Sequence, residues 1–385
     1  MDKKKEILFN LNNFLISTSS ALDAVETDIY KTTEAHSKKV AFIALKLAKE
    51  FNYEPEGLSD ICSYSLLHNI ALYKTRKKDK DYCELGQKLV DNFPFLGNEK
   101  DIIKYQLEYY NGSGPYGLKA DEIPLISQFL AFATIIDEKF DLSKKEIDNR
   151  NHIIKYVKEN ENILFSSDIV ECFCEFSENQ SFWLDLQNEH ELLTYIFTNL
   201  HDFSTPISFE ELLNLTRIFT DIIENNSSLI KNSEKMLDFY DFEHKDRLTF
   251  LIAASLTNLG KFFIPYQILN KDSELSEDEY EIIKSYPYYT KRILSNIMGF
   301  NDITTWASKT QEFIDGTGYP YCLKGKDLSF KDRLMIILNI YSALSSNKTY
   351  RQAFDKNEAF KILDELVENS KIDKAIVNDL KEVFE

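Results

Sequence analysis

The sequence predicts an all-α protein, and two observations carry this prediction. Apolar residues recur at helical spacing in several segments, and no segment alternates with a period of two for long. The 385 residues include only 11 glycines and 8 prolines, which gather around two related motifs and do not separate regular strands. With 43% hydrophobic residues, the chain is long enough for two or three domains, each with a packed core.

Three segments show the helical spacing most clearly. They cover residues 40–51, 212–223 and 334–341, and in each the apolar residues recur every three or four positions. Ser208 stands just before the second segment and is followed by two glutamates, the pattern of a helix N-terminus with a capping hydroxyl and an acidic first turn. We therefore expect a helix to begin directly after Ser208.

A glycine-rich motif occurs twice, at residues 111–118 and again at 315–323. Residues around the two copies correspond at a constant offset of 204 positions, which becomes 205 after one inserted residue. Such regular offsets indicate an internal duplication. The repeated pattern is interrupted near residue 200, so we predict two domains, 1–200 and 201–385, joined by a short linker.

Composition and charge exclude several classes of protein. The net charge of -18 opposes binding to a nucleic-acid backbone. The basic stretch from Lys74 to Lys80 is a local exception, which we expect to be a solvated loop, with phosphate binding as the alternative. No apolar run approaches the roughly 18 residues that cross a bilayer, and the five scattered cysteines suit a reducing compartment. We expect a cytoplasmic protein without a nucleic-acid partner or membrane insertion.

The second motif copy, from Asp315 to Pro320, resembles the signature of the HD-GYP family, and both halves of the chain resemble HD-GYP domains. The resemblance implies two tandem HD-domain-like helical bundles. It also implies hydrolysis of cyclic di-GMP with two or three iron- or manganese-type ions. Such a centre needs about four histidines and two aspartates from different helices, because several ions must be held around the phosphate.

The first half departs from the family's ligand pattern. His36 resembles the opening family histidine and His68 the histidine of the HD pair, whereas Asn69 replaces the aspartate of that pair. Tyr82 and Thr134 stand where the family has a further histidine and a late aspartate. Two imidazoles without a carboxylate hold a metal only weakly, so we interpret His36 and His68 as buried helix histidines.

The second half resembles the family scaffold more closely but has none of its metal ligands. Thr257 and Asn258 replace the HD pair, and Asn339 stands at the late aspartate. Lys261 is retained where the family has a lysine that meets a substrate phosphate, whereas Leu72 stands there in the first half. We therefore interpret the second half as a degenerate copy that retains the GYP loop, defined here as residues 315–320.

Two groups of residues in the second half are candidate binding sites. The candidates for a cyclic dinucleotide in the vacated pocket are Lys261, Arg333 and Arg351. The GYP loop has a structural interpretation, in which its glycines supply positive φ and Pro320 stiffens the turn. The alternative is that it docks a protein partner through Asp315, Gly316, Gly318, Tyr319 and Pro320. We interpret Glu108 and Glu312, which precede the two motif copies, as scaffold residues.

These departures predict a catalytically inactive tandem HD-GYP-like protein, a signalling or scaffolding module that binds a protein partner or a nucleotide. We expect no catalytic residue and no cofactor, with a single iron, manganese or zinc ion at His36 and His68 as the alternative. Two other functions stay open. One is a metal-dependent phosphodiesterase acting on cyclic di-GMP or a related phosphoester, and the other is a cyclic di-GMP sensor that does not hydrolyse its ligand.

Overall fold

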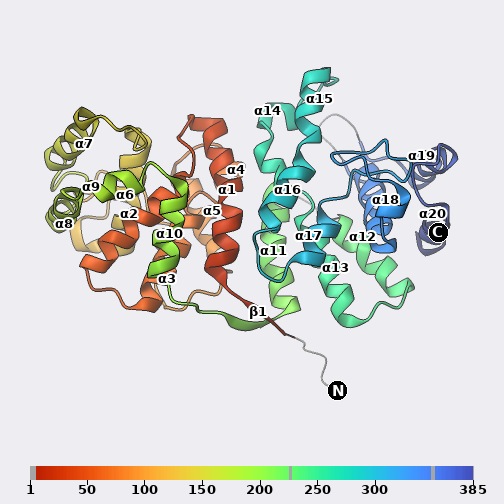
Figure 1. Ribbon diagram of the computed structural model, residues 1–385, viewed down its shortest axis with the longest axis horizontal. Coiled ribbons are helices and arrows are strands. Elements are labelled where there is room, and N and C mark those ends of the chain that lie inside the picture. The colour runs from red at the N-terminus through yellow and green to blue at the C-terminus, as the bar shows by residue number, and fades with distance from the viewer. Residues whose placement is uncertain (1–5, 225–227, 348–351, 385) are drawn as a thin grey trace. The chain divides into compact units, whose positions relative to one another are not determined.

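The computed structural model describes residues 6–224, 228–347 and 352–384, which are almost entirely helical (Figure 1). The chain divides into two compact units: the N-terminal unit is Asn10–Thr205, and the C-terminal unit is Pro206–Glu385 with strand β1 (Glu6–Phe9). The all-α prediction is confirmed except for one small sheet, in which β1 pairs with β2 (Thr205–Ser208). Every helix in the described ranges is too short or too polar to span a bilayer.

In the N-terminal unit, α2 (His36–Glu50) is the central helix. It packs against α1 (Leu11–Tyr30), α3 (Pro55–Leu67), α6 (Leu125–Lys139) and α10 (Glu189–Asn199). Within the predicted segment 40–51, residues 40–45 are all fully buried, whereas Lys49 and Glu50 near its end are exposed. The remaining elements are α4 (Leu72–Thr75), α5 (Lys80–Val90), η1 (Ala120–Glu122), α7 (Ile147–Glu159), α8 (Ser167–Ser177) and α9 (Gln180–Asp185).

In the C-terminal unit, α13 (His244–Leu256) packs against α11 (Phe209–Ile223), α12 (Ser228–Phe239) and α17 (Asn301–Ala307). The predicted start of α11 is confirmed, because Ser208 Oγ accepts a hydrogen bond from the Glu211 N–H at 3.1 Å. The predicted segment 334–341 lies within helix α18 (Phe330–Leu344). The remaining elements are η2 (Leu259–Phe263), α14 (Tyr266–Leu269), α15 (Glu277–Lys284), α16 (Tyr286–Leu294), η3 (Gly325–Asp327), α18 (Phe330–Leu344), α19 (Lys356–Glu368) and α20 (Lys374–Phe384).

Each unit contains a loop that is held by a buried glutamate, Glu108 in one and Glu312 in the other. Both carboxylates accept two hydrogen bonds from backbone N–H groups of the glycine-rich loop that follows, at 2.6 to 2.8 Å. The donors are Tyr116 and Leu118 for Glu108, and Tyr321 and Leu323 for Glu312. Charge-assisted bonds of this kind are strong. The prediction that both glutamates are scaffold residues is confirmed.

A candidate metal centre in the N-terminal unit

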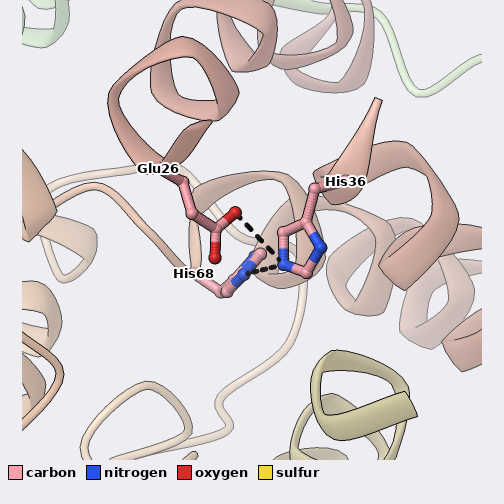
Figure 2. A group of neighbouring side chains, drawn as sticks. All are labelled: Glu26, His36 and His68. Atoms are coloured by element: carbon pink, nitrogen blue, oxygen red, sulfur yellow. Dashed lines mark hydrogen bonds and ion pairs between the residues drawn. The ribbon is translucent and has the colours of Figure 1, made fainter. Parts of the chain in front are cut away.

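Three buried side chains converge in the N-terminal unit: Glu26, His36 and His68 (Figure 2). Glu26 lies in the last part of α1, His36 is the first residue of α2, and His68 directly follows α3. Because α1, α2 and α3 pack against one another, residues that are up to 42 positions apart meet at one point. Their potential ligand atoms all lie within 4.8 Å of one another.

The geometry of the three side chains suits one divalent metal ion. His36 Nε2 lies 3.2 Å from His68 Nε2 and 3.4 Å from Glu26 Oε2. Glu26 Oε2 is buried and accepts no hydrogen bond from any described residue, which is a costly state for a carboxylate oxygen. Two imidazole nitrogens and one carboxylate oxygen are a common donor set for zinc and iron. A cation at their centre would satisfy the orphaned oxygen.

The two imidazoles are oriented by partners on their other ring nitrogen. His36 Nδ1 lies 2.6 Å from Asp137 Oδ2 on α6, and His68 Nδ1 lies 2.6 Å from the Ser65 carbonyl oxygen. Lys39 Nζ lies 3.5 Å from the second oxygen of Asp137. Outer partners of this type fix the tautomer and ring orientation of metal-binding histidines. They leave both Nε2 atoms directed at the shared centre.

The protonation of the cluster follows from its charges. Burial opposes the charge on His36, but Glu26 and Asp137 overcome it and raise the pKa of His36 to about 9. Burial and the neighbouring His36 lower the pKa of His68 to about 3, so this imidazole is neutral. Burial alone would raise the pKa of Glu26, but His36 and Lys78 reverse the effect and lower it. A metal ion would therefore compete with one proton, on His36.

Lys78 links the three-residue cluster to a pocket. Its Nζ lies 2.6 Å from Glu26 Oε1 and also pairs with Glu138, and its side chain is only 13% exposed. The expectation that the basic stretch is a solvated loop is therefore wrong at Lys78. The pocket has a volume of about 460 Å³. Its lining residues are Lys78, Gln106, Leu107, Tyr109, Ser113, Gly114, Pro115, Ala131, Thr134, Ile135 and Glu138.

Two neighbouring side chains hydrogen-bond to the backbone carbonyl of His68, and one of them, Tyr82, stands at a family ligand position. The Tyr82 hydroxyl lies 2.6 Å from the His68 carbonyl oxygen and 2.8 Å from Asn69 Oδ1, and Gln106 Nε2 donates to the same carbonyl at 3.2 Å. Thr134 lines the pocket. Asp137 lies on α6, one turn after Thr134. Its carboxylate contacts His36 Nδ1 and is not one of the three potential ligands of the centre.

The corresponding place in the C-terminal unit is organised differently. Asn258 Nδ2 donates to Glu224 Oε1 at 2.9 Å, and Lys261 Nζ lies 3.5 Å from the same oxygen and 5.5 Å from the centre of the Tyr286 ring. Thr257 and Tyr286 are buried. Across the described residues, this unit contains no cluster of three histidine, cysteine, aspartate or glutamate side chains suited to a metal. An ammonium and an amide there take the place of imidazoles.

The residues of the C-terminal unit that are predicted to bind a cyclic dinucleotide are not brought together by any contact between described residues. Lys261 pairs with Glu224. The Arg333 guanidinium donates to Asp373 at 3.1 Å, to the Gly325 carbonyl at 2.6 Å and to the Leu328 carbonyl at 3.1 Å. Arg351 lies outside the described residues. Arg333 is thus engaged in holding η3 and the start of α18, while ligand binding by these residues stays a prediction.

The GYP loop is tied to its own unit. Asp315 Oδ1 accepts hydrogen bonds from the Thr317 N–H and hydroxyl at 2.9 and 2.8 Å. Gly316 has a φ of 85°. A Cβ on Gly318 would lie 2.4 Å from the Cα atom of Glu312 and the backbone nitrogen of Phe313. The Tyr319 hydroxyl donates to Gln311 at 3.1 Å, and the peptide bond to Pro320 is cis. These contacts agree with the structural interpretation, and partner docking stays a prediction.

Sequence reasoning missed Glu26 and Asp137, and it missed the contact of Lys78 with Glu26, although it named phosphate binding as an alternative for the basic stretch that contains Lys78. A signal was present for the two acids, because Glu26 lies four residues after Leu22 and Asp137 four after Ala133, at helix positions whose neighbours are buried. An acid on the apolar side of a helix indicates a buried partner. Lys78 had no such signal, since its position depends on the course of a loop.

Comparisons with known proteins show which proteins this chain is similar to. The sequence pattern described as HD domain matches residues 36–161 and 210–376. The chain is 20% identical over 393 residues to 3'3'-cGAMP-specific phosphodiesterase 1 of Vibrio cholerae, covering 95% of this chain and 90% of the relative. It is 26% identical over 267 residues to 3'3'-cGAMP-specific phosphodiesterase 3 of the same organism, covering 67% of this chain and 57% of that relative.

A solved structure shows the same fold. The crystal structure of a cyclic GMP-AMP specific phosphodiesterase of V. cholerae, V-cGAP3, superimposes with a TM-score of 0.69 at 18% identity, over 98% of each chain. The all-α HD-domain fold of the present chain is thereby established.

Two further expectations from the sequence are wrong. The prediction of a catalytically inactive signalling or scaffolding protein is contradicted by the phosphodiesterases among its relatives, one of which matches 95% of the chain. The expectation of no cofactor is contradicted by the buried cluster, in which Glu26 supplies the carboxylate that His36 and His68 lacked in the sequence analysis. The physical reason is that Glu26 lies on α1, outside every sequence motif. The packing of α1 against α2 and α3 brings its carboxylate to the two imidazoles. The chain belongs to the HD-domain family.

Proposed function

We propose that this protein is a metal-dependent phosphodiesterase that hydrolyses a cyclic dinucleotide in its N-terminal unit. The observation that carries the proposal is the buried group of Glu26, His36 and His68, which Lys78 connects to a pocket of about 460 Å³. The names of the V. cholerae relatives support 3'3'-cGAMP as the first substrate to test, with cyclic di-GMP as the second.

Each residue of the site has a definite task in this proposal. Glu26 Oε2 and the Nε2 atoms of His36 and His68 would hold one divalent ion of the iron, manganese or zinc kind. Such an ion supplies a water nucleophile at neutral pH and neutralises phosphoryl charge. Asp137 keeps the His36 Nδ1–H oriented, and the Ser65 carbonyl does the same for His68.

The pocket beside the ion site suits a phosphorylated ligand. Its volume lies in the roughly 300–1,000 Å³ range of small-molecule sites. Lys78 offers a positive charge for a phosphate, while Gln106, Ser113 and Thr134 offer hydrogen-bonding groups. Tyr109 gives an aromatic surface on which a base can stack. The pocket wall includes the loop that Glu108 holds, so the scaffold and the binding site are connected.

We further infer that the two units are tandem copies of one HD-type bundle, and that the ion site is confined to the first. Support comes from the constant sequence offsets and from the family pattern, which matches once in each unit. The equivalent hydrogen bonds of Glu108 and Glu312 support it further. One inserted residue in the second loop lengthens the spacing from Glu312 without changing the bonding pattern.

The test uses the full chain, purified without chelators and analysed for metal content. We expect about one iron, manganese or zinc ion per chain. We also expect hydrolysis of 3'3'-cGAMP, which is measured by chromatography of the linear product. His68→Ala removes both properties, whereas His152→Ala, an exposed histidine on α7, leaves them unchanged. A wild-type chain that takes up none of these ions and leaves both dinucleotides intact would refute the proposal.

A further inference from the structure

Lys78 contacts the candidate metal centre from the side of the pocket. The Glu26 carboxylate is divided between two neighbours, since Oε1 receives the Lys78 ammonium at 2.6 Å and Oε2 faces His36 at 3.4 Å. The same ammonium also pairs with Glu138, so it lies between two carboxylates, beside the position proposed for a metal ion.

The loop that carries Lys78 is anchored to the same helix as Glu26. The backbone N–H of Lys78 donates to the Tyr30 hydroxyl at 3.0 Å, and Arg76 Nη2 lies 2.9 Å from Asp28 Oδ2. These contacts fix the backbone, while the lysine side chain keeps several rotatable bonds. The ammonium can therefore move without displacing the loop.

A divalent ion at the cluster would repel this ammonium. Two positive charges that share one carboxylate at short range disfavour each other strongly in a buried site. Glu138, the second partner of Lys78, lines the pocket and would retain the displaced ammonium there. The family's phosphate-binding lysine position holds Leu72 in this unit, so Lys78 is the basic residue on the pocket wall.

We propose that Lys78 is a displaceable internal cation, which neutralises Glu26 in the metal-free protein, releases it to an incoming metal ion and then binds a phosphate of the cyclic dinucleotide. This inference rests on the proposed function and adds two opposite roles for one side chain. Lys78 weakens metal binding and strengthens substrate binding. Replacing a residue with a merely structural role would weaken both metal binding and substrate binding.

The test compares Lys78→Met with Lys77→Met, which removes the same charge from a neighbouring exposed lysine that pairs with Asp79. Calorimetric titration of metal-free protein with Mn²⁺ should show binding about tenfold tighter in K78M and unchanged in K77M. On the Mn²⁺-loaded proteins, KM for 3'3'-cGAMP should rise about tenfold in K78M alone. Lys78→Arg, which keeps the charge, should bind Mn²⁺ like the wild type.

Each outcome decides a part of the proposal. Weaker or unchanged Mn²⁺ binding in a folded K78M overturns the cation exchange, and an unchanged KM overturns the phosphate contact. If wild type and K78M both fail to bind Mn²⁺, the proposed function falls as well, whereas binding by K78M alone supports the exchange. Circular dichroism checks folding, and Lys78→Gln, which can still hydrogen-bond both glutamates, replaces K78M if that variant is unfolded.

Discussion

The N-terminal and C-terminal units place different side chains at corresponding positions after their third long helix. In the first unit, His68 follows α3 and meets His36 and Glu26. In the second, Thr257 follows α13, and the neighbouring Asn258 and Lys261 share Glu224. The difference teaches that the two carboxylates are compensated in different ways. Glu26 is fully buried and is compensated by an imidazolium and an ammonium, whereas Glu224 is 23% exposed and is compensated by an ammonium and an amide.

The largest expected effect comes from removing the carboxylate in each unit. Glu26→Gln keeps the shape but removes the charge that a divalent ion needs, so we expect metal affinity to fall by about 100-fold or more and hydrolysis to be lost. Glu224→Gln is the matched change in the C-terminal unit and should leave the metal content intact. Elemental analysis after dialysis measures both. An equal loss in the two variants would show that the ion site is not confined to the first unit.

The next effect concerns Asp137, whose carboxylate contacts His36 Nδ1. Asp137→Asn weakens the orientation of His36, and we expect a loss of metal affinity of roughly 10- to 100-fold. Asp121→Asn, an exposed change on η1 of the same unit, serves as the control. Mn²⁺ titration by calorimetry is the measurement. Wild-type affinity in D137N would remove Asp137 from the site.

A smaller effect is expected where the two units are alike. Glu108→Gln and Glu312→Gln each disturb two charge-assisted hydrogen bonds to a loop, and we expect each to lower the free energy of unfolding by about 1.5–3 kcal/mol. Urea unfolding measures the change. Only E108Q should also impair hydrolysis, because Ser113, Gly114 and Pro115 of its loop line the pocket. Equal impairment by E312Q would contradict the assignment of the pocket to one unit.

The last effect concerns pH. His36 has a folded-state pKa of about 9, above its ordinary value of 6.5, so its interactions stabilise the metal-free protein fully below pH 6.5. This contribution is lost as the pH rises from 6.5 to 9, while His68, with its pKa lowered to about 3, stays neutral in the folded state over that range. Unfolding free energies of chelator-treated protein should therefore decline across this window. His36→Gln should flatten the decline, and a wild-type profile without one would contradict the assigned charge.

Much of the helical architecture was predictable from local pattern. The segments at 212–223 and 334–341 and the cap at Ser208 follow from the spacing of apolar residues and from one hydroxyl, which act within a few residues. The scaffold role of Glu108 and Glu312 followed from their place beside the repeated loop. These features need only short-range information.

The metal centre was only partly predictable. His36 and His68 are predictable as possible ligands because they stand at family positions, but the motifs of the sequence contain no carboxylate to complete the centre. Glu26 stands ten residues before His36, where no motif points to it. A search for acids on apolar helix faces would have found Glu26 and Asp137, but not the pairing of each with His36.

The sequence by itself determined the helices, the duplicated loop and the two candidate imidazoles, because periodicity and motifs are properties of neighbouring residues. Only the tertiary structure decided that the imidazoles share a buried carboxylate and that Lys78 stands between them and the pocket. Ligand sets depend on which side chains are brought within a few ångströms by helix packing. In this protein the packing of α1 against α2 and α3 made that choice.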